Sequence, residues 1–425
     1  MTHVLIVGGG FAGLAAARGL AGAPGVEVTL LDRRNHHLFQ PLLYQVAMAG
    51  LSPAEIAAPI RGLLRGARNV RVRQEEAIGA DLERRILRTR ADGREHEHAY
   101  DHLILACGSG HAYFGRDEWE EFAPGLKSLA QALEIRRRVL SAYERAELES
   151  DALRQRALLT FVVVGGGPTG VELAGALGEM SRFTLARDFR NIDPALARVI
   201  LIEAGPRILP SFPETLASRA MRDLEALGVQ VWTSSPVTQV DASGVEVGRE
   251  RLEAVTTLWA AGVEASPLGK ALGLETDRHG RILVGPDLTL RDHPEVFVLG
   301  DQAHALGPGG APLPGLAPVA MQQGRFAARV IRDELRGKPR GAFVYRDRGQ
   351  MATIGRSRAI CETGRLRFGG FAAWLFWLCV HIYFLVGFKN RLFVVLQWAW
   401  SYLTYGRGAR LIVSRDWRRS GELSG

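Results

Sequence analysis

The hydrophobic pattern at the start of the chain predicts a strand, a tight turn and a helix. Residues 4–7 are an unbroken apolar run, Gly8 to Gly13 are rich in glycine, and an Ala/Leu-rich helical stretch follows to about residue 21. A second apolar run, 26–31, ends in Asp32, 19 residues beyond Gly13. This order of elements indicates a βαβ unit built on a parallel sheet.

The same pattern returns about 157 residues later in the chain. An apolar run at 159–164 leads into Gly165 to Gly170 and a helix, and a strand at 199–202 closes with Glu203. The chain therefore contains a duplicated βαβ unit. This duplication predicts an α/β fold with two Rossmann-like dinucleotide-binding domains.

Other segments show weaker patterns. They are predicted as a connecting helix with a solvated Arg/Glu face (133–148), strand-like structure (284–301), a loop (307–312) and an amphipathic helix (318–335).

The C-terminal region contains two uncharged runs, 368–388 and 392–406. The first has 21 residues, which is long enough for a helix to cross a bilayer core of roughly 30 Å. Cations flank it on both sides, the second run is short, and tryptophans are distributed as in interfacial helices. We favour helices that lie in the plane of the membrane surface, with a transmembrane helix as the alternative.

Composition supports a folded protein with a sizeable core, since 47% of the 425 residues are hydrophobic and 23% are charged. The net charge of +8 lies entirely in residues 351–425, which hold eleven Lys/Arg and three Asp/Glu. A neutral body disfavours nucleic-acid binding and leaves the basic tail to attract anionic lipid. The strand-like N-terminus shows no signal peptide, so we expect a cytoplasmic body.

The three cysteines, Cys107, Cys361 and Cys379, are widely spaced and form no CxxC. Neither a disulfide framework nor a zinc site is indicated, and the histidines His36, His37 and His304 lack metal-ligand spacing. We expect no metal.

Each glycine motif predicts a dinucleotide site. Its three glycines permit a tight turn, a close approach to a pyrophosphate and close packing of helix on strand, and the helix N-terminus attracts the phosphates. The acid that ends the next strand accepts hydrogen bonds from ribose hydroxyls, so Glu203 favours NADH over NADPH; Arg207 is placed to weaken that preference. The glycines are Gly8, Gly10 and Gly13 in the first motif and Gly165, Gly167 and Gly170 in the second.

With these motifs the chain resembles the two-dinucleotide-binding-domain flavoproteins and, among them, the type II NADH dehydrogenases. Further motifs carry the resemblance: residues 105–108, 259–263, 296–301 and 315–324. The resemblance implies non-covalent FAD on the first unit, near Asp32, Gly108, Asp301, Ala317 and Pro318. It implies NADH on the second, near Glu203 and Gly262. The implied domains are FAD-binding (1–115 and 287–335), NADH-binding (116–286) and membrane-anchoring (336–425).

The segment Phe39 to Gln45 is very similar to a run in the type II NADH dehydrogenases. It contains Gln40, a candidate catalytic residue, and Tyr44, a candidate quinone residue. Disulfide reductases place a redox cysteine pair about here, whereas this chain has no cysteine before Cys107. Thiol chemistry at the flavin is therefore excluded.

Residues 317–322 resemble the family's quinone motif through Ala317, Ala320 and Gln322, with Pro318 at the place of the first glutamine. Pro318 is also suited to start a helix whose dipole stabilises charge on reduced flavin. The resemblance places Glu172 near nicotinamide, flavin and quinone, where it orients substrate or helps to deliver protons; the alternative is a plain helix-start glutamate.

The resemblance implies a peripheral, non-proton-pumping NADH:quinone oxidoreductase on the cytoplasmic face of the membrane, and we expect a homodimer. One alternative is a sulfide:quinone oxidoreductase, which needs a cysteine pair; Cys107 lies in a predicted strand with no evident partner. Another is a soluble flavin-dependent redox sensor or interaction protein resembling apoptosis-inducing factor.

Overall fold

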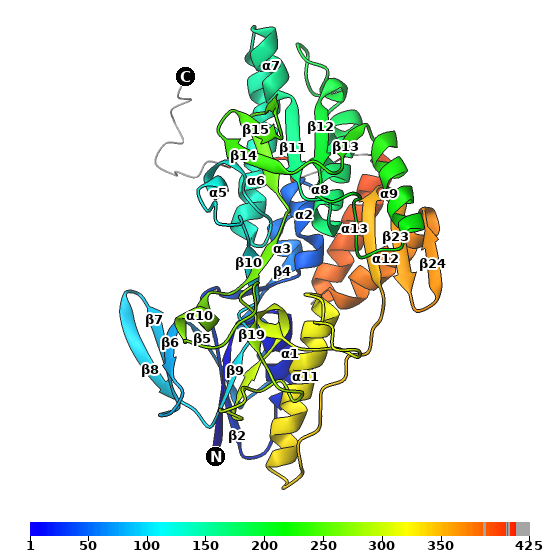
Figure 1. The fold of residues 1–425 in the computed structure, drawn as a ribbon. Helices are drawn as coiled ribbons and strands as arrows, with labels where there is room; N and C mark the ends of the chain where they lie inside the picture. Colours follow the sequence, from blue (N-terminus) through cyan, green and yellow to red (C-terminus); the bar gives the residue numbers. More distant parts are fainter. Residues whose placement is uncertain (386–387, 405, 407–408, 414–425) are drawn as a thin grey trace. The chain divides into compact units, whose positions relative to one another are not determined.

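The computed structural model describes residues 1–385, 388–404, 406 and 409–413. The chain divides into two compact units, each assembled from three separate stretches (Figure 1). The first unit contains residues 1–38, 57–110 and 263–347; the second contains 39–56, 111–262 and 348–425. The FAD-binding, NADH-binding and membrane-anchoring domains implied by the resemblance have boundaries that differ from those of these two units, and they remain a prediction.

The first unit is built on a five-stranded parallel sheet with the strand order β20-β9-β1-β2-β5. Helices α1 and α11 pack against each other, and residues 4–6 in the central strand are fully buried. An unbroken apolar run is what a strand covered on both faces requires. The elements are β1 (Thr2–Val7), β2 (Val26–Asp32), β5 (Val70–Gln74), β9 (His102–Leu105), β20 (Val296–Val298), α1 (Phe11–Leu20) and α11 (Ala317–Glu334).

Smaller elements complete this unit, including an antiparallel sheet of strands β6 to β8. They are β3 (His36–Leu38), β4 (Ala57–Pro59), α4 (Ile60–Leu63), β6 (Glu76–Asp81), β7 (Ile86–Ala91), β8 (Arg94–Ala99), β10 (Ser109–His111), β18 (Val263–Ala265), α10 (Leu268–Ala271), β19 (Ile282–Leu283) and β21 (Ala303–His304).

The strand-like structure predicted for 284–301 is wrong over most of its length, because only β20 is a strand there. Pro286 and Pro294 lack the N–H that a sheet needs, and Leu288 adopts a positive φ of 66°. The helix predicted at 318–335 is confirmed as α11.

The second unit contains a four-stranded parallel sheet with the order β13-β12-β11-β17. Helix α6 begins at Leu129, one turn earlier than predicted, because the Ser128 hydroxyl accepts a hydrogen bond from the Gln131 N–H and caps it. The elements are β11 (Thr160–Val164), β12 (Arg198–Ile202), β13 (Val229–Trp232), β17 (Thr256–Trp259), α5 (Trp119–Phe122), α6 (Leu129–Leu148), α7 (Ala152–Leu158), α8 (Pro168–Glu179) and α9 (Glu214–Ala226).

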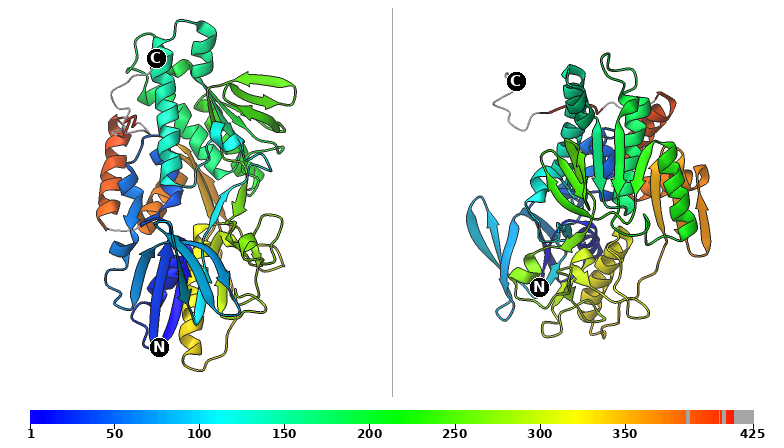
Figure 2. Two further views of the ribbon diagram at one scale, coloured as in Figure 1. Left: turned by 90° about the vertical axis from the view of Figure 1, so that its left-hand side faces the viewer. Right: turned by 45° about the horizontal axis from the view of Figure 1, so that its top comes forward.

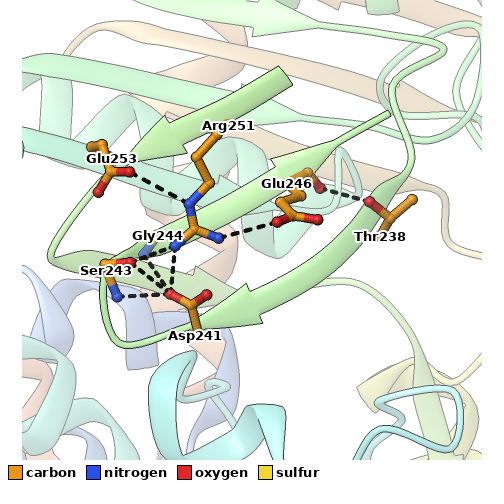
Figure 3. A network of polar contacts seen from close by, with 7 residues as sticks. All are labelled: Thr238, Asp241, Ser243, Gly244, Glu246, Arg251 and Glu253. Carbon is orange, nitrogen blue, oxygen red and sulfur yellow. Dashed lines mark hydrogen bonds and ion pairs between the residues drawn. The ribbon is translucent and has the colours of Figure 1, made fainter. Parts of the chain in front are cut away.

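An antiparallel sheet follows β13 and is tied together by one arginine (Figure 3). Its strands are β14 (Val237–Asp241), β15 (Gly244–Val247) and β16 (Glu250–Glu253). The Arg251 guanidinium lies 2.6 Å from the Asp241 carboxylate, 3.7 Å from that of Glu246 and 3.6 Å from that of Glu253. Its hydrogen bond holds the pKa of Asp241 below the usual range. These charges stabilise the hairpins and carry no candidate site residue.

The C-terminal part of the second unit is an antiparallel sheet followed by two helices. Helix α13 packs against α12 and against α3, which comes from the first 56 residues (Figure 2). The Trp398 indole N–H donates to the Gln45 amide oxygen at 2.7 Å. The elements are β22 (Gln350–Gly355), β23 (Arg358–Thr363), β24 (Leu366–Gly369), α12 (Phe371–Phe384), α13 (Phe388–Thr404), α2 (Leu43–Ala47) and α3 (Pro53–Ile56).

Within the part of the chain that the structure describes, no helix combines the length and apolarity needed to cross a bilayer. The first uncharged run forms a helix of 14 residues, α12, instead of a continuous helix over 368–388. Four cations of the basic tail, Arg407, Arg415, Arg418 and Arg419, lie outside the described residues.

Gly175 brings helix α8 against strand β22. A Cβ atom at this position would lie 1.7 Å from the Ile354 carbonyl oxygen, so one element would have to move. We expect Gly175→Ala to lower the free energy of unfolding by about 1–3 kcal/mol or more, measured by urea denaturation. Gly66→Ala is the control, because nothing lies within 4 Å of the added methyl. Equal stability of the two variants would contradict this packing.

Candidate functional site

The first glycine loop joins β1 to α1 and packs tightly on its own backbone. Gly8 has a φ of 105°, and a Cβ there would lie 2.3 Å from the Ala106 carbonyl oxygen. A Cβ at Gly13 would lie 1.8 Å from the Gly8 carbonyl oxygen, whereas a Cβ at Gly10 would meet nothing within 4 Å. The loop is thus closed toward the sheet and open at Gly10, as a phosphate cradle requires.

Asp32, at the end of β2, holds this loop in place. One carboxylate oxygen accepts the Gly9 N–H at 2.6 Å and the other accepts the Arg34 N–H at 2.7 Å. The buried His37 ring also contacts the loop, because its Nδ1 donates a hydrogen bond to the Gly9 carbonyl oxygen at 2.9 Å. Burial lowers the pKa of His37, so the ring is neutral at pH 7. His37 therefore supports the loop as a buried, neutral side chain.

The other predicted FAD residues of the first unit lie near one another. The Asp301 carboxylate accepts the Ser109 hydroxyl at 2.7 Å, and Ser109 follows the predicted Gly108. A Cβ at Gly300 would lie 3.5 Å from the Ala320 methyl and 3.6 Å from the Ala12 methyl. Residues from the glycine loop, from the segment that follows β9 and from α11 therefore lie together at the carboxyl end of the parallel sheet, where α/β folds bind ligands.

Helix α11 begins at Ala317 with Pro318 in its first turn, as predicted. The Gln322 side chain forms two 3.0 Å hydrogen bonds with the backbone of Arg346, one with its N–H and one with its carbonyl. The neighbouring Gln323 is 1% exposed and accepts the Gly300 N–H at 2.6 Å. Gln323 was missed by sequence reasoning, although its spacing from the buried positions 319, 320 and 327 places it on the inner face of the helix.

The second glycine loop repeats the geometry of the first. Gly165 has a φ of 107°, and a Cβ there would lie 2.6 Å from the Ala260 carbonyl carbon. A Cβ at Gly170 would lie 1.8 Å from the Gly165 carbonyl oxygen, and Gly167 is open. The two βαβ units predicted from the sequence therefore have glycine loops with nearly the same conformation and the same close backbone contacts.

Glu203 takes the place of Asp32 in the second unit. Its two carboxylate oxygens accept the N–H groups of Gly166 and Gly205, each at 2.6 Å. Arg207 donates to the carbonyls of Pro210 and Phe212, at 2.8 and 2.9 Å. Arg207 is therefore engaged with the backbone of its own loop rather than with Glu203.

Glu172 lies in the second turn of α8, which packs against β22. Desolvation raises the pKa of its carboxyl to about 8, and a hydrogen bond from the Thr353 backbone opposes this only in part. The side chain is therefore mainly protonated at pH 7 and can act as a proton donor. From the local sequence alone, a glutamate near a helix start would be expected to carry a charge. The strand β22 that packs against this helix is distant in the sequence, so its effect on Glu172 could not be foreseen.

Gln40 and Tyr44 belong to the second unit as well. Gln40 begins a short 3-10 turn, is exposed, and donates to the Lys127 carbonyl at 3.1 Å. Tyr44 is buried in α2, where its hydroxyl accepts the Gln45 amide at 2.9 Å. The bond from Trp398 to Gln45 continues this chain of contacts into α13.

The predicted residues thus fall into two groups. The first unit gathers the FAD residues with Ala320 and Gln322, and the second gathers the NADH residues with Glu172, Gln40 and Tyr44. Gly262 has a φ of 81° just beyond β17. Among the described residues, no cluster of three His, Cys, Asp or Glu side chains suits a metal ion.

The chain matches two family models: residues 2–324 match pyridine nucleotide-disulphide oxidoreductase, and residues 348–408 match the NDH2 C-terminal domain. It is 44% identical to the type II NADH:quinone oxidoreductase Ndh of Mycobacterium tuberculosis, covering 97% of this chain and 91% of that protein. It is 43% identical to NdhA of the same organism, covering 97% and 90%.

Among solved structures, NDH2 from Plasmodium falciparum in complex with NADH has the same fold, with a TM-score of 0.88. That match covers 97% of this chain and 100% of the other at 18% identity. The chain belongs to the pyridine nucleotide-disulphide oxidoreductase family and, within it, to the type II NADH:quinone oxidoreductases.

Proposed function

We propose that this protein oxidises NADH and reduces a membrane quinone without pumping protons, using non-covalently bound FAD. When bound, FAD accepts a hydride from NADH and passes two electrons to the quinone. The observation that carries the proposal is the pair of glycine loops, each closed toward its sheet, open at the middle glycine and tied to its own carboxylate. One loop is assigned to FAD and the other to NADH.

In this proposal the first loop holds the FAD pyrophosphate at Gly8, Gly10 and Gly13, and Asp32 accepts the ribose hydroxyls. Gly108 and Asp301 lie beside them, and the N-terminus of α11 at Ala317 and Pro318 faces the flavin. Its helix dipole would stabilise negative charge there. The open space above Gly10 and the close approach of Gly8 to Ala106 fit such a ligand.

The second loop would hold NADH at Gly165, Gly167 and Gly170, with Gly262 at its edge. Both oxygens of Glu203 already face backbone N–H groups near the loop. A 2′-phosphate would be repelled by this carboxylate, and Arg207 is engaged elsewhere. The site is therefore assigned to NADH rather than NADPH.

Glu172 is assigned to proton delivery, because its raised pKa keeps a proton on the carboxyl at neutral pH. The candidate quinone residues are Ala317, Ala320 and Gln322 of α11 in the first unit and Tyr44 of α2 in the second. Gln40 and Gln322 are assigned a catalytic role. The paired hydrogen bonds of Gln322 with Arg346 also give this glutamine a role in holding the backbone at residue 346.

Attachment to the membrane is assigned to α12 and α13, on the cytoplasmic leaflet. Both helices expose large apolar side chains that would enter the bilayer interface, with nearby cations attracted to anionic lipid. The protein is expected to be a homodimer. The exposed apolar side chains are Phe371, Leu375, Phe376, Leu392, Phe393, Val395, Leu396 and Trp400.

The cysteines disfavour the sulfide:quinone alternative. Cys107 lies beyond the end of β9, not within the predicted strand, and burial raises its pKa to about 12. A thiol of this kind is a poor nucleophile. The Aquifex aeolicus sulfide:quinone oxidoreductase shares the fold at 19% identity and a TM-score of 0.72. Rapid steady-state oxidation of NADH with a soluble quinone would likewise exclude a redox sensor.

Reversing the charge at Glu203 tests the assignment of the second loop. Glu203→Arg is expected to raise the NADPH/NADH ratio of kcat/KM at least tenfold, on the order of one lost charge repulsion. Arg198→Glu, at the far end of β12, is the control for a charge change on the same strand. An unchanged ratio in Glu203→Arg would show that this residue does not discriminate the two nucleotides.

The raised pKa of Glu172 makes stability depend on pH. Between pH about 4.5 and 8 the native carboxyl keeps a proton that the unfolded chain has released, so the free energy of unfolding falls as pH rises. Glu172→Gln removes this dependence and should be more stable than wild type at pH 8 but not at pH 4.5. Urea denaturation at both pH values measures this dependence, and parallel curves would contradict a desolvated, protonated Glu172 carboxyl.

Catalysis gives a second readout for the same variant. Wild-type turnover with quinone should decline as pH rises through about 8, while Glu172→Gln should be slower and lack this decline. FAD content, read from the flavin absorbance, should be unchanged.

Charges placed on α13 test the membrane assignment. Leu392→Glu with Leu396→Glu should weaken binding to anionic vesicles at least tenfold, because both side chains are about half exposed and would have to be desolvated. Leu148→Glu with Leu153→Glu is the control, with equal charge on exposed leucines of α6 and α7. Equal sedimentation of both double variants with vesicles would refute the assignment to α13.

A further inference from the structure

An exposed phenylalanine occupies an unfavourable backbone position in the second unit. The Arg116 N–H donates to the Tyr113 carbonyl at 3.0 Å, which closes a four-residue turn with Phe114 and Gly115 at its centre. Their φ angles are 54° and 83°. Turns with two positive φ values favour Asn, Asp or Gly at the first central position, yet here it carries a Phe ring that is 71% exposed. Neither backbone preference nor burial accounts for this residue.

The base of this turn is held firmly at the end of strand β17. The Trp259 indole N–H donates to the Ala112 carbonyl at 3.0 Å, and the Tyr113 ring stacks on Trp259 at 5.1 Å. The Tyr113 hydroxyl donates to the Ala123 carbonyl at 2.9 Å. Phe114 therefore projects from a rigid platform, with its ring edge against Trp259 at 6.2 Å.

The tip of the Phe114 ring lies over Gly262. A Cβ at Gly262 would lie 2.7 Å from the Phe114 Cζ atom. Gly262 comes two residues after Ala260, whose N–H donates to the Val164 carbonyl at 2.7 Å and whose backbone packs against Gly165. The exposed ring is thus at the edge of the second glycine loop.

The strand order indicates which half of a dinucleotide comes to this edge. The strands lie in the order β13-β12-β11-β17. Glu203, which follows β12, is the expected partner of the adenosine ribose, and the glycine loop after β11 is the expected site of the pyrophosphate. A dinucleotide that runs from β12 across β11 continues toward β17. Its nicotinamide half therefore reaches the side of the sheet where Phe114 projects.

We propose that Phe114 is a positioning residue whose ring packs against the nicotinamide of NADH; this rests on the assignment of the second loop to NADH. An aromatic ring provides a flat apolar surface for another ring. Because the turn is already ordered, little conformational freedom is lost when the nucleotide covers the ring. This role would explain the unfavourable backbone conformation of the turn, which holds an aromatic side chain away from the core and toward the ligand.

Equilibrium binding to the oxidised, FAD-loaded protein tests this assignment without turnover. Calorimetry compares NAD⁺ with ADP-ribose, which has the same adenosine and pyrophosphate but no nicotinamide. Phe114→Leu should weaken NAD⁺ binding about 3- to 10-fold, as for one lost aromatic contact. The same variant should change ADP-ribose binding less than about twofold, and Phe114→Tyr should restore NAD⁺ binding.

Two further variants separate ring contact from turn structure. Phe114→Gly removes both the ring and the unfavourable φ, and it should lose NAD⁺ affinity as Phe114→Leu does while melting no lower than wild type. Phe183→Leu, an exposed phenylalanine elsewhere in the second unit, should change neither affinity.

Equal weakening of NAD⁺ and ADP-ribose, or no weakening in Phe114→Leu, would overturn the proposal. Failure of the underlying assignment gives a different result, because wild-type protein would then bind neither nucleotide or leave NADH unoxidised.

Discussion

Each unit depends on one repeated interaction, in which a carboxylate at the end of the second strand accepts a backbone N–H of the glycine loop before it. Asp32 binds Gly9 and Glu203 binds Gly166, both at 2.6 Å. The acid can reach the loop only because the loop is pressed against its own sheet. Gly8 and Gly165 lie so close to the backbones of Ala106 and Ala260 that a Cβ would not fit. Backbone shape and binding chemistry are therefore set by the same few atoms, and a loop shaped in this way leaves its middle glycine open to a phosphate.

Local features of the chain could be predicted from the sequence because they depend on nearby residues. Apolar runs and glycine spacing predict β1, β2, β11 and β12 with both loops, since a strand, a tight turn and a helix are each short-range structures. Contacts between distant segments could not be predicted. The bonds of Gln322 with Arg346, the burial of Gln323 and the cover of Glu172 by β22 depend on how the units fold. The strand-like reading of 284–301 failed for a different reason, because two prolines interrupt an otherwise suitable pattern.

The grouping of segments gives the C-terminal helices a second role besides exposing apolar side chains. The segment from Phe39 to Ile56 lies in the same unit as α12 and α13, and it is joined to α13 by the bond from Trp398 to Gln45. Gln45 in turn donates to the hydroxyl of Tyr44. Helix α13, which exposes apolar side chains, is thus linked through two hydrogen bonds to Tyr44, a candidate quinone residue. The net positive charge is confined to the part of the chain that follows residue 350, the same part that contains α12 and α13. This position supports the assignment of membrane attachment to the C-terminal region.

Two glutamates of the second unit show how environment separates functions that the sequence cannot distinguish. Glu203 emerges at a strand end among backbone N–H groups, which suit a charged acceptor. Glu172 is only two residues beyond the glycine loop, yet packing of α8 against β22 removes water from its carboxyl and raises the pKa to about 8. The helix dipole near its start would favour the charged form, so desolvation is the larger effect at this position. One carboxyl is thereby suited to bind hydroxyl groups and the other to hold a proton, within a single compact unit.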